Sequence, residues 1–128
     1  MNIGIICTAL LGLLLFGLGL HVSLQRRQNR RSSGYDASPT DPLHRAVRAH
    51  ANTAEYAPFF AVLFLWFATR PAPTWILATI VLATVARFAI AGALLFGPTL
   101  NRPNPARFFG ALFTYLCGLA LAVGLVAT

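Results

Sequence analysis

Residues 3–24 read IGIICTALLGLLLFGLGLHVSL, a run that contains no charged side chain. Because about 20 apolar residues in helical form cross the ~30 Å hydrocarbon core of a bilayer, this run predicts a membrane-spanning helix. Its positive charges follow it, beginning with Arg26 and Arg27. A cleaved signal peptide carries such charges before its apolar run, so we interpret this helix as a retained anchor.

The composition of the whole chain supports a membrane protein. Hydrophobic residues make up 57% of the 128 residues and charged residues only 10%, whereas a soluble domain carries about 25% charged residues. The net charge is +7, and all ten basic residues are arginine. Arginines concentrated beside a membrane span are typical of a cytoplasmic flank in contact with anionic lipid, so they do not indicate a nucleic-acid-binding protein. Without lysine, Schiff-base chemistry is excluded.

Three further apolar segments follow the first, separated by short stretches rich in proline, glycine and polar residues. A polar loop is expected over residues 25–42, and Asp41 followed by Pro42 is typical of a helix N-cap and first helical position. Short connections favour antiparallel neighbours. We therefore expect an all-α fold, an integral membrane four-helix up-down bundle forming a single domain over residues 1–128, with helices at about 3–24, 43–69, 74–96 and 106–126.

The distribution of arginine predicts how the bundle is oriented. Loops one and three share a side of the membrane, and that side holds nearly all of the arginines, including Arg102 and Arg107. The opposite side holds only Arg70. By the positive-inside rule, we expect loops one and three in the cytoplasm and both termini outside, in a multi-pass protein of the inner, or cytoplasmic, membrane.

The second helix carries an unusual polar segment, RAVRAHANTAEY from Arg45 to Tyr56. Polar groups are costly inside a membrane span and call for a reason. Four of them recur at helical spacing and fall within about 80° of arc, on a single face. They are Arg45, Arg48, Asn52 and Glu55.

Arg87 on the third helix lies at about the same depth as Glu55, so we expect these two side chains to face each other. The surplus of positive charge around them favours an anionic ligand. The alternative to a ligand site is that the polar side chains only form contacts between helices.

Other kinds of site find little support. Cys7 and Cys117 lie inside apolar runs and are interpreted as small buried hydrophobes. The three histidines are separated and lack metal-ligand spacing, so we predict no metal site. No serine has the surroundings of a catalytic triad.

Residues 48–58, RAHANTAEYAP, resemble the second-helix motif R-A-x-x-N-x-x-E-Y-x-P of the MAPEG proteins, the membrane-associated proteins in eicosanoid and glutathione metabolism. The length of the chain, its four spans and its basic first loop agree with a prokaryotic-type member. The resemblance implies a homotrimer that binds glutathione between neighbouring subunits near the cytoplasmic surface. The residues that it assigns to this site are Arg48, His50, Asn52, Glu55 and Tyr56, and we expect Arg87 to organise them.

The resemblance also places an arginine pair after the first helix, which Arg26 and Arg27 match approximately. Arginine pairs well with the carboxylates of glutathione, and nearby arginines favour the reactive thiolate. This chain departs from conjugating members on the third helix, where Phe88 and Gly92 stand in place of tyrosines. No arginine occurs at the end of that helix before Arg102, which is a candidate substitute.

Two interpretations remain open. In the first, the protein binds glutathione or a similar anionic thiol and transfers it to a lipophilic small molecule, as a membrane glutathione transferase, with Arg26, Arg27 or Arg102 stabilising the thiolate. In the second, the same scaffold is a non-catalytic lipid- or anion-binding protein, or a partner subunit. The missing third-helix tyrosines favour the second interpretation, so the sequence does not decide whether the protein is an enzyme. A transporter is disfavoured by the lack of a broken helix pair.

Overall fold

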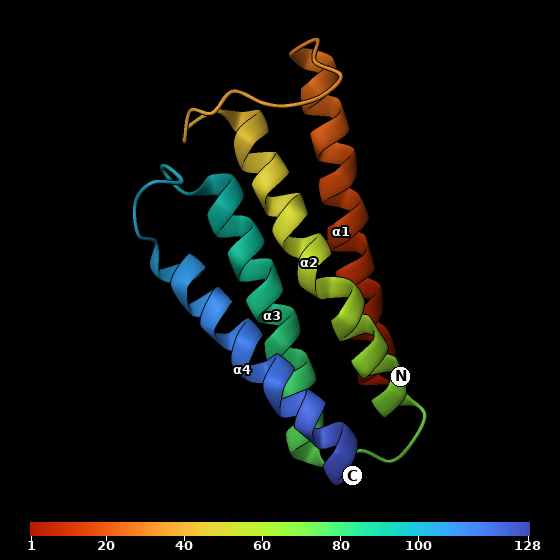
Figure 1. Cartoon of the computed structure of the whole chain (residues 1–128). Coiled ribbons are helices and arrows are strands. Elements are labelled where there is room, and N and C mark those ends of the chain that lie inside the picture. The colour runs from red at the N-terminus through yellow and green to blue at the C-terminus, as the bar shows by residue number, and fades with distance from the viewer.

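The computed structural model describes all 128 residues and contains four α-helices and no strand. Successive helices run in opposite directions, which confirms the all-α up-down bundle (Figure 1). The α1–α2 and α3–α4 loops lie at one end, called here the arginine-rich end, and both termini lie towards the other. The helices are α1 (Ile3–Gln28), α2 (Pro42–Ala68), α3 (Thr74–Phe96) and α4 (Pro105–Ala127).

The bundle is built from two tightly packed pairs, α1 with α2 and α3 with α4, which are joined mainly through α2 and α3. Helices α1 and α4 are not direct neighbours in the bundle. The main core contains fully buried side chains from all four helices, among them Leu11, Phe64, Ile80 and Leu121. In a membrane such a core is held by close van der Waals packing, because lipid tails are as apolar as the side chains themselves.

Glycine permits the closest of these approaches. A Cβ atom at Gly110 of α4 would lie 3.0 Å from the Cβ of Ile90 and 3.1 Å from the carbonyl oxygen of Ala86, both on α3. Only a residue without a side chain lets the two backbones come this close. The α3–α4 pair therefore depends on the glycine at this position.

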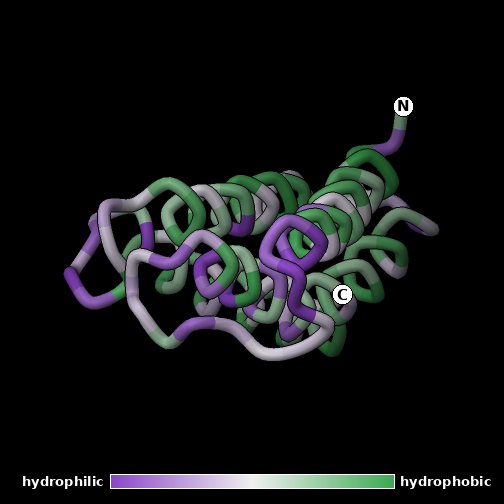
Figure 2. The backbone as a smooth tube through the Cα atoms, turned by 90° about the horizontal axis from the view of Figure 1, so that it is seen from above, coloured by the Kyte–Doolittle hydropathy of each residue, from purple (hydrophilic) through white to green (hydrophobic).

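The outside of the bundle is apolar, as expected of a protein surrounded by lipid. Three helices, α1, α3 and α4, are long and apolar enough to cross a membrane. Their exposed side chains include Phe16, Phe96 and Leu119, with exposed fractions of 78%, 83% and 67%. Figure 2 shows mostly hydrophobic colouring along the helices, with hydrophilic colouring mainly in the loops and at helix ends.

Helix α2 is the polar member of the bundle. With 27 residues it is long enough to cross the membrane, but its first half carries the polar segment between Arg45 and Tyr56. Because of this segment, α2 is less apolar than the other three helices. Helix α2 nevertheless packs between α1 and α3. The helix is continuous through Pro58.

One helix boundary differs from the sequence-based expectation. Helix α1 continues to Gln28, four residues beyond the apolar run, so Arg26 and Arg27 lie on its last turn and not in the loop. Hydropathy marks where apolar residues end, whereas glutamine and arginine are good helix formers and continue the helix into the polar surface. The connecting loop is therefore shorter than predicted.

The loops at the arginine-rich end are tied to the bundle and to each other. The side chain of Asp41 accepts a hydrogen bond from the His44 N–H at 2.8 Å, which confirms the predicted N-cap of α2. A guanidinium N–H of Arg26 donates to the Gly34 carbonyl oxygen at 2.5 Å. The Leu100 N–H of the α3–α4 loop donates to the Pro39 carbonyl oxygen at 3.1 Å. Both loops therefore hold defined positions above the polar half of α2.

Candidate functional site

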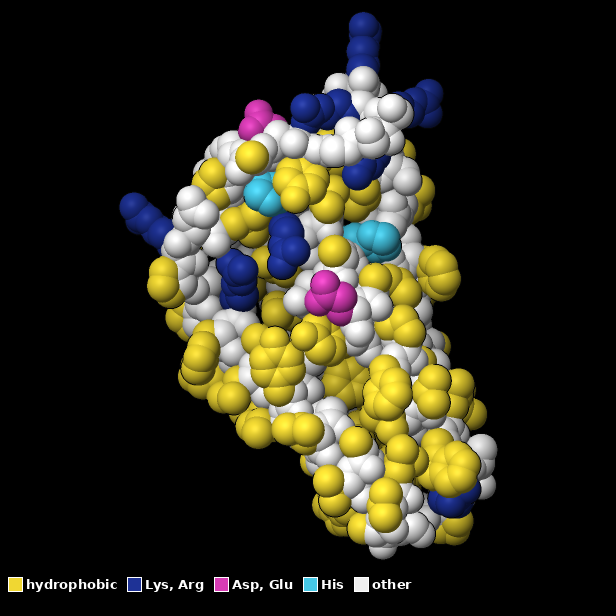
Figure 3. Space-filling model, in the orientation of Figure 1, with side chains coloured by type: hydrophobic (Ala, Val, Ile, Leu, Met, Phe, Trp, Pro, Cys, Tyr) yellow, Lys and Arg dark blue, Asp and Glu magenta, His cyan; other side chains and the backbone are white.

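The predicted polar residues of α2 lie on a side of the helix that no other helix covers fully. Arg48 and Glu55 are exposed, and Asn52 and Tyr56 are half-buried. Figure 3 shows arginine and acidic side chains exposed together in the upper half of one face, above a largely hydrophobic surface. The polar side chains are therefore accessible from outside the single chain, to a ligand or to another subunit.

Helical geometry explains why Glu55 points outward. Thr53, with no exposed surface, marks the side of α2 that is buried in the bundle. Glu55 follows two residues later, about 200° around the helix axis. Asn52 lies between these two directions, which places its amide at the edge of the bundle.

Arg87 is the largest fully buried side chain of the protein, with no exposed surface. One guanidinium nitrogen donates to the side-chain oxygen of Asn52 at 2.5 Å, and the other terminal nitrogen donates to the Thr114 hydroxyl at 3.3 Å. Its Cζ atom lies 5.1 Å from the centroid of the Tyr56 ring, in a cation–π arrangement. A single cation on α3 thus joins α2 and α4.

The expected direct pair between Glu55 and Arg87 is wrong. The guanidinium reaches Asn52, one turn earlier on α2, while Glu55 is exposed on the outer side of that helix. Glu55 and Arg87 lie at a similar depth along the bundle, but this depth does not determine the direction in which a side chain points. The Nε atom of Arg87 is left buried without a hydrogen-bond partner. The site therefore contains a buried positive charge held by neutral groups.

A groove of about 530 Å³ opens beside this cation, between α2 and α4. Glu55, Tyr56, Thr114 and Tyr115 form its polar part, and Leu119 lies in its apolar part. The rings of Tyr56 and Tyr115 meet edge to face, with centroids 5.9 Å apart. Because Tyr56 and Thr114 also contact Arg87, the groove adjoins the residues that hold the cation.

Sequence reasoning missed Tyr115 and Thr114. Both occur in the apolar run of α4 without a neighbouring charge, so neither periodicity nor motif distinguished them. The one available signal was the buried arginine, which needs acceptors from the helices packed against it. A hydroxyl on α4 at matching depth was the natural candidate.

The remaining predicted residues do not meet the polar face of α2 within one chain. His50 is directed towards α1, where a Cβ at Gly19 would lie 3.3 Å from its Nε2 atom. Arg27 is exposed on the last turn of α1. Arg102 is exposed and lines a separate cavity of about 390 Å³ together with Arg107.

These features define a class of protein: a membrane bundle of four helices whose second helix carries an exposed arginine–asparagine–glutamate face backed by a buried arginine. The sequence profile of the MAPEG family matches residues 4–127, nearly the whole chain, and the protein belongs to this family. Comparisons with curated proteins and with solved structures gave no match. Family membership confirms the resemblance noted from the second-helix motif.

Proposed function

We propose that the protein binds glutathione, or a similar anionic thiol, on the exposed polar face of α2 and transfers it to a lipophilic electrophile. The supporting observation is that Arg48 and Glu55 point out of the single chain from a helix of a membrane bundle. A charged side chain facing lipid costs about 2.5–3.5 kcal/mol at the bilayer centre even on lenient scales, and this cost applies to Glu55, ten residues deeper along α2 than Arg45. Polar groups must therefore cover this face of α2. An anionic ligand and a neighbouring subunit would together provide these groups.

The same uncovered side of α2 supports the homotrimer that the family implies. It continues from the polar residues as Phe59, Val62 and Trp66, with exposed fractions of 62%, 63% and 45%. From Arg48 to Trp66 this side of α2 follows alternating spacings of four and three residues, through the half-buried Asn52 and otherwise exposed side chains, which is typical of a helix that packs along a seam. The ligand would then lie where subunits meet at the polar end of that seam.

The charges of glutathione suit this arrangement. Its carboxylates pair with the guanidinium of Arg48, which offers two parallel N–H donors. Its ammonium group pairs with the carboxylate of Glu55. The Asn52 oxygen accepts from Arg87, so its amide N–H groups are free to donate to the ligand. Tyr56 adds a hydroxyl at the edge of the same face.

Transfer requires that the thiol loses its proton to water and that the sulfur attacks the electrophilic carbon. A carbon–sulfur bond forms, and the leaving group departs with the electrons of its bond. Arg26, Arg27 and Arg102, all at the arginine-rich end, are our candidates for stabilising the thiolate. The apolar groove between α2 and α4 would admit the electrophile from the lipid, and Tyr115 offers there a tyrosine hydroxyl, which α3 lacks.

The proposal places the arginine-rich end in the cytoplasm and both termini outside, in keeping with the positive-inside rule. Water-soluble glutathione then reaches the polar end of α2 from the cytoplasm, while the electrophile arrives through the bilayer. The two substrates would meet where the polar face of α2 adjoins the apolar groove.

A conjugation assay tests this function. Purified protein is mixed with glutathione and a chromogenic aryl halide, and the formation of the aryl thioether is followed by absorbance. We expect turnover that is lost in Arg48→Ala and retained in Arg70→Ala, which removes an exposed arginine at the opposite end of the bundle. Glutathione binding without turnover would support the non-catalytic binder, as Phe88 and Gly92 on α3 suggest. Absence of glutathione binding would contradict the proposed function.

A further inference from the structure

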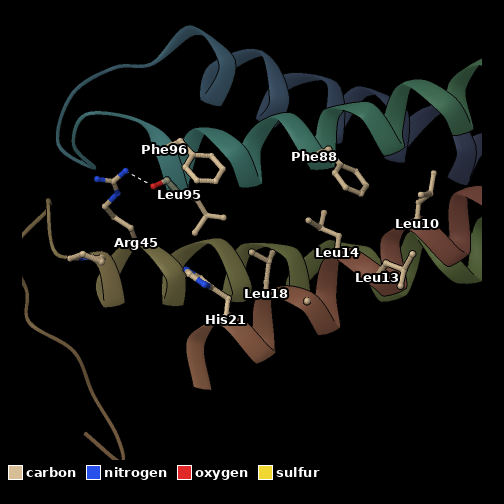
Figure 4. Close-up of a pocket in the computed structure, with 11 residues that line it drawn as sticks. Leu10, Leu13, Leu14, Leu18, His21, Arg45, Phe88, Leu95 and Phe96 are labelled. Carbon is tan, nitrogen blue, oxygen red and sulfur yellow. Dashed lines mark hydrogen bonds between the residues drawn. The ribbon is translucent and has the colours of Figure 1, made fainter. Parts of the chain in front are cut away.

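A second groove, of about 610 Å³, lies between α1 and α3 and is closed at the arginine-rich end by Pro42 and Arg45 of α2. Leu14 and Gly17 of α1 and Phe88 of α3 form its apolar walls, and Figure 4 shows Leu14 and Phe88 directed towards each other. Its volume falls within the roughly 300–1,000 Å³ of sites that hold small organic molecules. None of its residues lines the α2–α4 groove proposed for the electrophile, and none is among Arg48, Asn52, Glu55 and Tyr56, so the proposed function does not explain it.

The two ends of this groove differ in chemistry. Leu10 and Leu13 lie at one end, and His21 and Arg45 lie at the other, towards the arginine-rich end (Figure 4). Arg45 donates from Nε to the Leu94 carbonyl oxygen at 3.4 Å and from a terminal nitrogen to the Leu95 carbonyl oxygen. A guanidinium has five N–H groups, so these bonds fix its position and leave donors free for an anion.

The length of the groove matches one leaflet of a bilayer. From Leu10 to His21 it follows α1 for eleven residues, which is about 16 Å at 1.5 Å per residue. Half of the ~30 Å hydrocarbon core is about 15 Å. A chain lying in this groove would therefore reach from the headgroup region, at Arg45, to the middle of the bilayer.

We propose that the α1–α3 groove binds an anionic phospholipid of the leaflet at the arginine-rich end. One acyl chain lies along Leu14, Gly17 and Phe88, and the phosphate accepts hydrogen bonds from Arg45 and His21. Basic pockets between transmembrane helices commonly hold anionic headgroups. Arg26 follows His21 by little more than one turn of α1, so the local charge favours a headgroup with net negative charge over a zwitterionic one.

Glycine substitutions test the acyl-chain part of the proposal. A Cβ at Gly17 has no atom within 4 Å, so Gly17→Leu places its side chain in the groove without displacing protein atoms. Gly12→Leu is the matched control, because Gly12 is on the same helix, is equally free of neighbours and does not line the groove. The full-length protein is purified from vesicles containing equal amounts of phosphatidylglycerol and phosphatidylcholine, and retained lipid is measured by native mass spectrometry.

We expect the wild-type protein and Gly12→Leu to retain phosphatidylglycerol over phosphatidylcholine, and Gly17→Leu to lose about tenfold of the retained phosphatidylglycerol. Arg45→Gln should abolish the preference between headgroups while some lipid remains bound. Equal lipid retention by the two glycine variants would overturn the proposal. So would a changed oligomeric state in Gly17→Leu with unchanged lipid, which would assign the groove to a neighbouring subunit.

A second measurement does not depend on the folding of Gly17→Leu. Phe88→Trp places a fluorophore on the wall of the groove in a protein that contains Trp66 and Trp75 at the far end of the bundle. We expect brominated phosphatidylglycerol to quench the added fluorescence more strongly than brominated phosphatidylcholine. Equal quenching by the two lipids, or quenching only by a free brominated fatty acid, would contradict the phospholipid site.

Discussion

The guanidinium of Arg87 on α3 donates to the side-chain oxygen of Asn52 on α2, at a distance of 2.5 Å. Because this bond uses the amide oxygen of Asn52, the amide N–H groups of the same side chain point away from Arg87. A fully buried cation therefore sets the orientation of a residue on the exposed polar face. Through this contact, the packing of the bundle and the proposed binding face depend on each other.

Breaking this contact should destabilise the protein. A hydrogen bond to a charged group contributes about 1.5–3 kcal/mol, and Asn52→Ala removes it while leaving the charge buried. We expect Arg87→Met and Asn52→Ala each to lower the free energy of unfolding in detergent, and the double variant to lose less than the sum. Additive losses would show that the two side chains do not interact. Glu55→Gln, combined with Arg87→Met, should show weaker coupling because Glu55 lies outside the contact.

The close approach of α3 and α4 gives a prediction about glycine. In Gly110→Ala the new Cβ would lie 3.0 Å from the Cβ of Ile90, so the helices must separate. Overpacking of this kind costs about 1–3 kcal/mol, and we expect a lower melting temperature by circular dichroism. Gly92→Ala is the control, because a Cβ there has no atom within 4 Å. Its stability should rise slightly, since alanine favours helix over glycine by about 0.5–1 kcal/mol.

The proposed seam along α2 can be tested by cross-linking. Val62 is 63% exposed in the single chain, at a position where the seam would bring α2 helices of different subunits together. We expect Val62→Cys to form disulfide-linked dimers in membranes treated with a mild oxidant. Val85→Cys on α3, where valine is 58% exposed, should remain monomeric on the same gels. Cross-linking of Val85→Cys alone would place the subunit interface on α3 instead.

The groove between α2 and α4 should control access of the electrophile. A Cβ at Gly118 would be in ordinary contact with the Phe60 ring at 3.7 Å, so Gly118→Leu extends its side chain into the groove. We expect the KM for a bulky lipophilic electrophile to rise about tenfold, while the Kd for glutathione stays the same. Steady-state kinetics and calorimetry measure the two quantities separately. A weakened Kd with unchanged KM would mean that the groove holds the thiol.

Much of the fold could be predicted from the sequence, because length, hydropathy and proline placement are properties of the chain itself. The apolar runs predicted all four helices, and the Asp41–Pro42 start of α2 is present. The end of α1 was predicted too early, because the helix continues into Gln25 and Arg26 after the apolar residues stop. Hydropathy reports the boundary of the hydrocarbon, which need not be the boundary of the helix.

The site could be predicted only in part. Helical spacing placed Arg45, Arg48, Asn52 and Glu55 on one face of α2, and depth along the helices placed Arg87 at the level of Glu55. The side chain of Arg45 instead turns to α3, where it donates to the Leu94 and Leu95 carbonyl oxygens. The partner of Arg87 was assigned wrongly because depth carries no information about rotation of a helix around its axis. Tyr115 was missed because a tyrosine in an apolar helix gives no signal until its neighbours on α2 are known.

The central claim is that the exposed face of α2 binds an anionic thiol, and a direct binding measurement tests it. Glutathione is titrated by calorimetry into the purified full-length protein, into Arg48→Ala and into the control Arg70→Ala. We predict that Arg48→Ala weakens binding about ten- to a hundredfold, as expected for loss of about 1.5–3 kcal/mol from a charged hydrogen bond, and that Arg70→Ala leaves the Kd unchanged. Equal affinity of the wild-type protein and Arg48→Ala for glutathione would contradict the claim.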